Sequence, residues 1–160
     1  MGTILVATDG SAAASAALDA ALGLAAETGD EVVAITVWRA LQGDYGLAHP
    51  SAAVLDDLLM AEREHAEATL TEATRRAEAA GVRVRTRLAV GDPASEICAH
   101  ARDVDARLIA VGTRGYGSVA SLLLGSVSNE VIRRAACPVL VIREPTRAAA
   151  SGSFVTATAA

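Results

Sequence analysis

Short apolar runs alternate with longer amphipathic stretches along most of the chain. Apolar runs of about five residues are typical of strands buried in a parallel sheet, and stretches of helical period are typical of the helices that connect such strands. The pattern predicts strands over residues 3–8, 31–38, 82–88, 108–111 and 138–142. It predicts helices from the turn at 9–11 to about 29, from 55 to 81, over 93–103 and over 126–135. The sequence therefore predicts an α/β fold with one parallel sheet.

The second predicted helix has an apolar face and a charged face. Glu72 and Arg76 lie four residues apart on the charged face, where they are expected to pair. The apolar face carries Leu55, Leu59, Ala66, Leu70, Ala73 and Ala77. Residues 39–51, just before this helix, have no clear period and are predicted to form a long loop, of the kind that often acts as a lid.

The third predicted strand alternates strictly between two kinds of side chain. The side chains expected to point inward are Val82, Val84, Thr86 and Leu88, and those expected to point outward are Arg83, Arg85 and Arg87. Arginines on one face fit two interpretations, a stripe that binds nucleic acid and a charged sheet edge that blocks association with other edges. We favour the sheet edge.

Composition narrows the class of protein. With 160 residues, of which 52% are hydrophobic and 21% charged, the chain resembles an ordinary soluble domain. Residues 1–144 are predicted to form this single domain. Residues 145–160 contain few large apolar side chains and are predicted to be a disordered tail.

The charge balance argues against nucleic acid as a partner. The net charge is −5, aromatic residues make up 2% of the chain, and all 14 basic residues are arginines. Nucleic-acid-binding proteins usually have a basic balance and aromatic stacking groups. The absence of lysine also excludes a Schiff-base lysine and the GxxxxGK[ST] phosphate loop.

Cysteine usage and the amino terminus predict a cytoplasmic protein. Cys98 and Cys137 are the two cysteines, and their spacing suggests neither a disulfide framework nor a zinc ribbon. We expect two buried thiols in a reducing compartment. The start of the chain, MGTILVATDGS, does not read as a signal peptide, and no apolar stretch approaches the roughly 20 residues that span a bilayer.

The segment GTRGYGSVASLLLGSVS, residues 112–128, joins a predicted strand to a predicted helix and is rich in glycine and hydroxyl side chains. Gly112 ends the strand where the chain must turn, and Gly115 can take a positive φ. Gly125 leaves the backbone N–H groups of the following helix open to a phosphate, which the helix dipole favours. Ser126 is expected to add a hydroxyl donor there and to cap the helix.

Ser128 adds a second hydroxyl to this segment. The residues alone favour phosphate binding only slightly over a structural turn, because most glycine-rich loops merely turn. The segment does not match the dinucleotide fingerprint G-x-G-x-x-G, which follows the first strand of a βαβ unit; the first strand here leads into TDGS.

The spacing G-2x-G-9x-G-S, followed by a helix and CPVLVI, together with the amino-terminal ILVATDGS, closely resembles the universal stress protein family. The resemblance covers residues 3–143. It implies a Rossmann-like fold with helices on both faces of the sheet, strand order 3-2-1-4-5, and ATP binding where the glycine motif is intact. In that order the first and fourth strands are neighbours, so ATDGS and GTRGYGS would face each other across one crevice.

The resemblance also implies which residues contact the nucleotide. Asp9 matches an acidic residue that contacts the ribose or a Mg²⁺ ion near the phosphates, although it also fits a turn residue. Val37 matches an apolar contact to adenine, although a core valine fits nearly as well. The phosphate and ribose segment corresponds to Gly112, Thr113, Arg114, Gly115, Gly125, Ser126, Val127 and Ser128. For Arg114, a phosphate contact and a solvated loop position are equally compatible with the sequence. Tyr45 and His49 lie in the predicted loop and could close over the base, but we favour the interpretation that they are ordinary loop residues.

Candidate catalytic groups are few. The sequence has no GxSxG motif, and His49, His65 and His100 have no metal-ligand spacing. The resemblance also implies that slow ATP hydrolysis or self-phosphorylation is possible, because parts of the family have these activities, and the sequence excludes neither. We therefore expect an ATP-binding stress-response or regulatory protein, which forms a homodimer through the edge strand at residues 138–142. The alternatives are a scaffold of the same fold that binds no nucleotide and a flavodoxin-like carrier.

Overall fold

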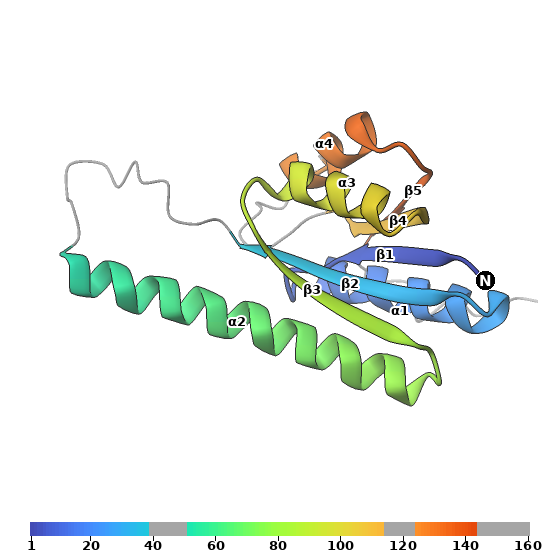
Figure 1. Cartoon of the computed structure of the whole chain (residues 1–160), viewed down its shortest axis with the longest axis horizontal. Helices are drawn as coiled ribbons and strands as arrows, with labels where there is room; N and C mark the ends of the chain where they lie inside the picture. The colour runs from blue at the N-terminus through green and yellow to red at the C-terminus, as the bar shows by residue number, and fades with distance from the viewer. Residues whose placement is uncertain (39–50, 114–123, 144–160) are drawn as a thin grey trace, which may run out of the picture.

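The computed structural model describes residues 1–38, 51–113 and 124–143 (Figure 1). Its strands are β1 (Thr3–Ala7), β2 (Glu31–Trp38), β3 (Val84–Val90), β4 (Ala106–Gly112) and β5 (Val139–Ile142). Its helices are α1 (Ala12–Thr28), α2 (Ala52–Ala79), α3 (Pro93–Asp103) and α4 (Ser126–Arg134). The predicted loop up to residue 50 and the predicted tail lie outside the described residues.

The strands form one sheet in the order β3-β2-β1-β4-β5, and every neighbouring pair is parallel. Helices α1 and α2 cover one face of the sheet, and α3 and α4 cover the other (Figure 1). Successive side chains of a strand point to opposite faces. In β1, Ile4 and Val6 accordingly pack with α1 and α2, whereas Leu5 packs with α3 and α4. The predicted fold class and strand order are confirmed.

The helix ends follow the local signals in the sequence. The Ser11 hydroxyl accepts a hydrogen bond from an N–H of the first turn of α1, as an N-cap does. The same helix ends at Gly29, whose φ of 74° lies in the left-handed region that glycine tolerates. Asp92 caps α3 by accepting a hydrogen bond from the Ser95 N–H at 3.0 Å, and Pro93 is the first helical residue.

Strand β3 covers Val84–Val90 instead of the predicted 82–88, because it pairs with β2 up to the last residue of each strand. Val82 is buried, but its N–H donates to the carbonyl of Ala77 at the end of α2. Val82 therefore belongs to the segment that connects α2 to β3. Thr86 was predicted to point inward and is exposed. Val84 and Leu88, which share its face of the strand, do pack against the core under α1 and α2, so the predicted alternation holds. Thr86 is exposed because β3 is the edge strand of the sheet and is only partly covered.

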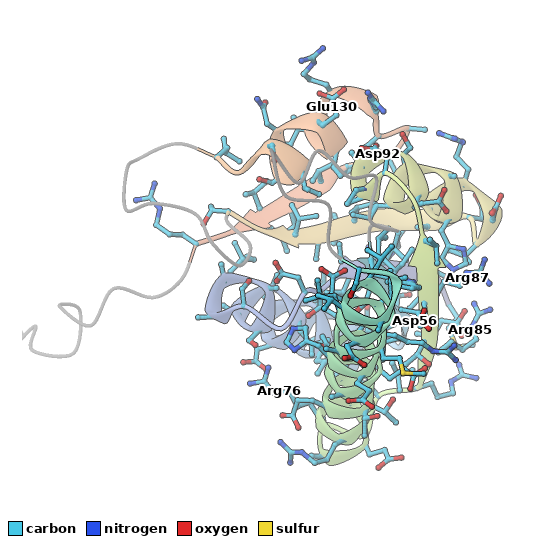
Figure 2. All side chains as sticks on the ribbon, turned by 90° about the vertical axis from the view of Figure 1, so that its left-hand side faces the viewer. Asp56, Arg76, Arg85, Arg87, Asp92 and Glu130 are labelled. Carbon is cyan, nitrogen blue, oxygen red and sulfur yellow. The ribbon has the colours of Figure 1, made fainter. Side chains whose placement is uncertain are left out.

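The arginines of β3 lie along this outer edge, where Arg85 and Arg87 project away from the sheet (Figure 2). Arg85 forms an ion pair with Glu31 of β2. The hydrogen bond from Arg85 is the main reason why the pKa of Glu31 is lowered. These contacts agree with the interpretation of the stripe as a charged sheet edge.

Helix α2 is longer than the sheet that it covers. Its 28 residues span about 42 Å, whereas the eight residues of β2 span about 26 Å. The amino-terminal half therefore extends past the sheet (Figure 1), and the exposed apolar side chains there are Val54, Leu58 and Met60. Leu55 and Leu59, predicted to lie on the buried face, are only half-buried for the same reason. Within the described ranges, no helix is long and apolar enough to cross a membrane.

The carboxyl-terminal half of α2 packs tightly. Ala66, Ala73 and Ala77 are almost completely buried. The predicted pair of Glu72 and Arg76 is present at 3.6 Å, and Arg76 also reaches Asp19 of α1 at 3.2 Å. Contacts between α1 and α2 thus fix this half of the helix on the sheet.

Candidate functional site

A cleft of about 860 Å³ lies at the carboxyl edge of the sheet, where β1 and β4 are neighbours. The connection from β1 passes over one face of the sheet and the connection into β4 over the other, which makes this the topological switch point where α/β proteins bind ligands. The walls come from the ends of β1, β2 and β4, from the starts of α3 and α4, and from one face of α2. The lining residues on the polar side of the cleft are Thr8, Asp9, Thr36, Gly125, Ser126 and Ser128.

The turn after β1 forms the first side of the cleft. The Asp9 carboxylate accepts a hydrogen bond from the Ser11 N–H at 3.0 Å, so it also organises the turn before α1. The Thr36 hydroxyl donates to the carbonyl of Thr8 at 2.8 Å, which ties β2 to the same turn. Asp9 thus lines the cleft and stabilises the turn, and the two interpretations of this residue are compatible.

Helix α2 packs directly on this turn. Gly10 has a φ of 80°, and a Cβ at this position would lie 3.0 Å from the hydroxyl oxygen of Thr69. The His65 Nε2 lies 3.2 Å from the carbonyl oxygen of Asp9. His65 lines the cleft, a place that was not predicted, because the sequence offered it only as a possible metal ligand. Its spacing of four residues from Thr69 is the signal that could have indicated a shared helix face.

Gly112 lies on the β4 side of the cleft. The structure explains the need for glycine at this position by a close backbone contact and not by the predicted turn. It is the last residue of the strand and is not among the described glycines with a positive φ. A Cβ here would lie 2.6 Å from the carbonyl carbon of Ala13 and 2.7 Å from the nitrogen of Ala14. Because both are backbone atoms, Gly112 allows β4 to approach the first turn of α1.

Helix α4 points its amino terminus into the cleft. Gly125 is the N-cap residue, and its own N–H donates to the carbonyl of Thr113 at 2.7 Å. The first backbone donor to an acceptor within the helix is Asn129, which bonds to the Gly125 carbonyl. The N–H groups of residues 126–128 precede it, and in the described part of the chain no side chain caps them. These N–H groups and the helix dipole favour an anion.

The two serines of this turn differ from the expectation. Ser126 is the first helical residue and does not cap the helix, because the chain is already in the N-cap conformation at Gly125. The Ser128 hydroxyl is buried and donates to the carbonyls of Gly125 and Thr113, at 3.0 and 3.3 Å. The Ser128 hydroxyl therefore stabilises the turn before α4, and the hydrogen-bond donors that line the cleft are the backbone N–H groups of the first turn.

The opposite wall of the cleft is apolar. It contains Ile35 and Val37 of β2, Pro93 and Ile97 of α3, and Trp38 at the end of β2. Val37 lines the cleft, is half-buried and also packs against the core cluster under α3 and α4, so it has the place of a core valine; its contact to adenine stays a prediction. A flat, apolar ligand group fits such a wall better than a charged one.

Four residues considered for the site fall outside the described ranges. Arg114, Gly115, Tyr45 and His49 lie outside the described residues. Thr113 is described, and it supplies the carbonyl that receives the Gly125 and Ser128 hydrogen bonds.

The titratable groups with shifted pKa values lie away from the cleft wall. Burial raises the pKa of the Cys98 and Cys137 thiols, so both favour the uncharged form. Burial also lowers the pKa of His100. Among the described residues, no group of three His, Cys, Asp or Glu side chains could hold a metal ion. The uncapped first turn of α4 beside the apolar wall is suited to binding an anion next to an apolar surface.

Comparison with known proteins agrees with this geometry. The model of the universal stress protein family matches residues 1–143. Universal stress protein YxiE of Bacillus subtilis (strain 168) is 35% identical over 144 residues, which cover 88% of this chain and 97% of that protein.

Solved structures extend the comparison to ligands. A universal stress protein in complex with cAMP is 33% identical with a TM-score of 0.68, and the match covers 90% of this chain and 98% of that one. The universal stress protein from Archaeoglobus fulgidus in complex with dAMP is 26% identical with a TM-score of 0.62, over 89% and 97% of the two chains. The chain described here belongs to the universal stress protein family.

Proposed function

We propose that this protein binds ATP in the cleft between β1 and β4 and acts as a regulatory module whose nucleotide-bound state is recognised by other molecules. The observation that carries the proposal is the first turn of α4, whose N–H groups face the cleft without a side-chain cap in the described residues. Relatives of similar fold bind cAMP and dAMP, which supports an adenine nucleotide. Those two ligands carry one phosphate each, so a nucleotide with three phosphates is a further step that we propose for this chain.

The cleft suggests how the nucleotide lies. The phosphates approach the N–H groups of residues 126–128, where the helix dipole and the absent Gly125 side chain favour them. The ribose lies near Asp9, and the adenine lies against Val37 and the apolar wall. Gly112 lines this site, the Thr113 carbonyl holds the turn before α4, and Arg114 and Gly115 continue the same segment of the sequence.

Asp9 also fits a Mg²⁺ ion bound together with the nucleotide. Protein sites often hold Mg²⁺ through one or two carboxylates plus phosphate oxygens, and the Asp9 carboxylate lines the cleft. The ion would screen the charge of the triphosphate. Isothermal titration with ATP, with and without Mg²⁺, tests whether the ion contributes to affinity, and repeating it with Asp9→Asn tests whether this carboxylate is responsible.

The purified protein itself tests the main proposal. Acid precipitation releases any bound small molecule, and chromatography of the supernatant identifies it. We expect ATP, either carried through purification or bound when added and retained on desalting. A protein without nucleotide that also fails to bind added ATP would be the scaffold, and a yellow protein that releases flavin would be the carrier.

We further propose that the protein is a cytoplasmic homodimer joined along β5. This strand lies at the edge of the sheet, and all four of its residues are half-buried valine, leucine or isoleucine. An apolar strand with one unpaired edge favours pairing with a second copy.

A further inference from the structure

The amino-terminal half of α2 carries an apolar stripe where the helix extends past the sheet (Figure 1). The Ser51 hydroxyl caps the first turn by accepting a hydrogen bond from the Val54 N–H at 3.4 Å, so this half is a regular helix. Val54 and Leu58, one turn apart, are 49% and 43% exposed, and Leu55 and Leu59 beside them are only half-buried. Apolar side chains in this helical spacing normally face a packing partner, and exposed clusters of them mark interaction sites.

Carboxylates border this stripe. Residues 51–67 contain five acidic side chains and one arginine, whereas the whole chain has 19 acidic and 14 basic ones. Asp57 follows Val54 by three residues and Glu64 follows Asp57 by seven, so both lie beside the stripe on the helix surface. Both are exposed, and neither forms an ion pair with another described residue. An occupant that is apolar along its middle and basic at its sides would complement this arrangement.

We refer to Val54, Leu58, Asp57 and Glu64 as the tip surface. Its charge argues against nucleic acid and anionic lipid, whose phosphates it would repel. It also argues against a symmetric contact with a second copy, because such a contact places the same patch on both sides and brings like charges together. A helix of another protein fits better, since helices commonly dock through an apolar stripe with complementary charges beside it.

The tip surface continues into the wall of the cleft. Leu58 lines the cleft together with Ala61 and His65, which follow it by three and seven residues on the same face of α2. His65 lies 3.2 Å from the carbonyl oxygen of Asp9. A partner on the tip surface would therefore contact the same helix that borders the proposed nucleotide site.

We propose that the tip surface docks a basic amphipathic helix of a partner protein. Apolar side chains of that helix pack against Val54 and Leu58, and its lysines or arginines lie near Asp57 and Glu64. The apolar contact supplies affinity, while the charges orient the partner and disfavour acidic ones. The inference goes beyond the nucleotide site and does not require nucleotide, so each can fail without the other.

A synthetic peptide tests this chemistry. The probe is a fluorescein-labelled helix of about 18 residues, five turns, with leucines along one face and lysines on the remaining positions. A second peptide has glutamate in place of every lysine. Fluorescence anisotropy in about 0.1 M salt, without nucleotide, measures the binding of each peptide to the full chain. We expect a dissociation constant of roughly 10 μM for the lysine peptide and binding at least about 100-fold weaker for the glutamate peptide.

Two double variants locate the site. Val54→Gln with Leu58→Gln removes the apolar stripe and keeps good helix formers at both positions. Asp57→Lys with Glu64→Lys reverses the charges beside the stripe. Each double variant should weaken binding of the lysine peptide by at least about tenfold. A lysine peptide that does not bind the wild type, or that binds both double variants as well as the wild type, would overturn the proposal.

Each double variant has a matched control. Met60→Gln makes the same kind of change on the opposite face of α2, where Met60 is 66% exposed. Glu27→Lys with Glu78→Lys changes the net charge by the same amount at exposed positions in α1 and at the other end of α2. Both controls should bind the lysine peptide like the wild type. If the charge control weakened binding as much as Asp57→Lys with Glu64→Lys, the attraction would be to net charge alone, and the proposal would fail.

Two further measurements distinguish other occupants of the tip surface. If other residues of the chain cover it, Val54→Gln with Leu58→Gln should lower the midpoint of thermal unfolding by more than about 5 °C, whereas an open surface predicts a change below about 2 °C. If a second copy covers it, light scattering should give the wild type a larger mass than this variant. Either result would overturn the proposal, and neither bears on ATP binding, which is titrated separately.

Discussion

Gly112 and Gly125 lie on the same side of one cleft, but the structure gives them different reasons to be glycine. At Gly112 a Cβ would meet the backbone of α1 at 2.6 Å. Gly125 has a φ of −60° and a ψ of 156°, which any residue can adopt, so its backbone conformation does not require glycine. At the scale of single residues, substitutions at these two positions should therefore separate folding from ligand binding.

Gly125→Val should abolish ATP binding while the protein stays folded. The β-branched side chain would occupy the space in front of the first turn of α4, and loss of several charge-assisted hydrogen bonds lowers affinity by at least about 100-fold. The loss of a preferred N-cap residue should cost no more than about 1 kcal/mol of stability. Isothermal titration and thermal unfolding measure the two effects.

Gly23→Val is a matched control for this experiment. Gly23 lies in α1 with no atom within 4 Å of an added Cβ, so the same chemical change is made away from the cleft. It should bind ATP like the wild type. If Gly125→Val did so too, the phosphates would not lie at this turn.

Gly112→Ala should destabilise the fold by about 3 kcal/mol, because its methyl group meets backbone atoms that cannot rotate away. For a chain of this size the midpoint of thermal unfolding should fall by about 10 °C. Gly23→Ala, in the open position of α1, should instead leave the midpoint unchanged or raise it. An unchanged midpoint for Gly112→Ala would show that β4 and α1 are further apart than described.

At the scale of elements, Asp30 joins the end of α1 to the starts of two strands. It accepts hydrogen bonds from the Gly2 N–H and the Thr28 hydroxyl and forms an ion pair with Arg107 of β4. The hydrogen bond from Thr28 is the main cause that lowers its pKa below the ordinary value of 3.8, followed by that from Gly2. The carboxylate thus links three elements on the edge of the sheet opposite the cleft.

This lowered pKa predicts a pH dependence of stability. A carboxylate whose pKa is lower in the folded state contributes fully above its unfolded pKa, and the contribution is lost as the pH falls through the folded value. Asp30→Asn should therefore be less stable than the wild type at pH 7, and the difference in unfolding free energy should shrink below about pH 4. Urea unfolding at pH 7, 5 and 3.5 measures it.

Asp57→Asn, at an exposed position of α2, is the control for these measurements. Its difference from the wild type should be small at all three pH values. A penalty for Asp30→Asn that stays constant down to pH 3.5 would contradict the linkage.

The elements show how far the sequence could predict this structure. The limits of β2 and the start of α3 at Asp92 and Pro93 were predicted correctly, because apolar runs and capping residues act locally. The limits of β3 were not, because pairing with β2 determines them. The role of α2 in the cleft was missed for a related reason: a helical period shows which side chains share a face, but not which neighbour that face meets.

In the candidate site, too, the parts with a local sequence signal were predicted and the parts that depend on packing were not. The glycine spacing and ATDGS indicated the two walls that face each other across the switch point. Trp38 and His65 were not identified, because nothing in their local sequence shows that β2 ends, and α2 passes, beside β1.

At the scale of the whole molecule, the free edge of β5 carries the proposed homodimer. The N–H groups of Ile109 in β4 and of Thr113, the residue after β4, donate to the carbonyls of Pro138 and Ile142, respectively. Alternate residues of a parallel strand bond to the same neighbour, so the backbone N–H of Val141 faces the free edge.

Val141→Pro should convert the dimer into a folded monomer. Proline removes an edge N–H that a second copy needs, and it leaves the ladder with β4 intact. Light scattering should give half the mass of the wild type, with an unchanged circular dichroism spectrum. Val141→Ala keeps the N–H and should stay dimeric; a dimeric Val141→Pro would place the interface elsewhere.

The contact between α2 and the turn after β1 has a mechanical consequence. His65 touches the carbonyl of Asp9, and from there the helix continues for about 20 Å to its amino terminus, past the sheet. A rigid rod held at such a point acts as a lever. A tilt of about 5° at the fulcrum moves the far tip by about 2 Å over that length. A tilt that hardly shifts His65 therefore displaces Ala52, at the amino terminus of α2, by this larger amount.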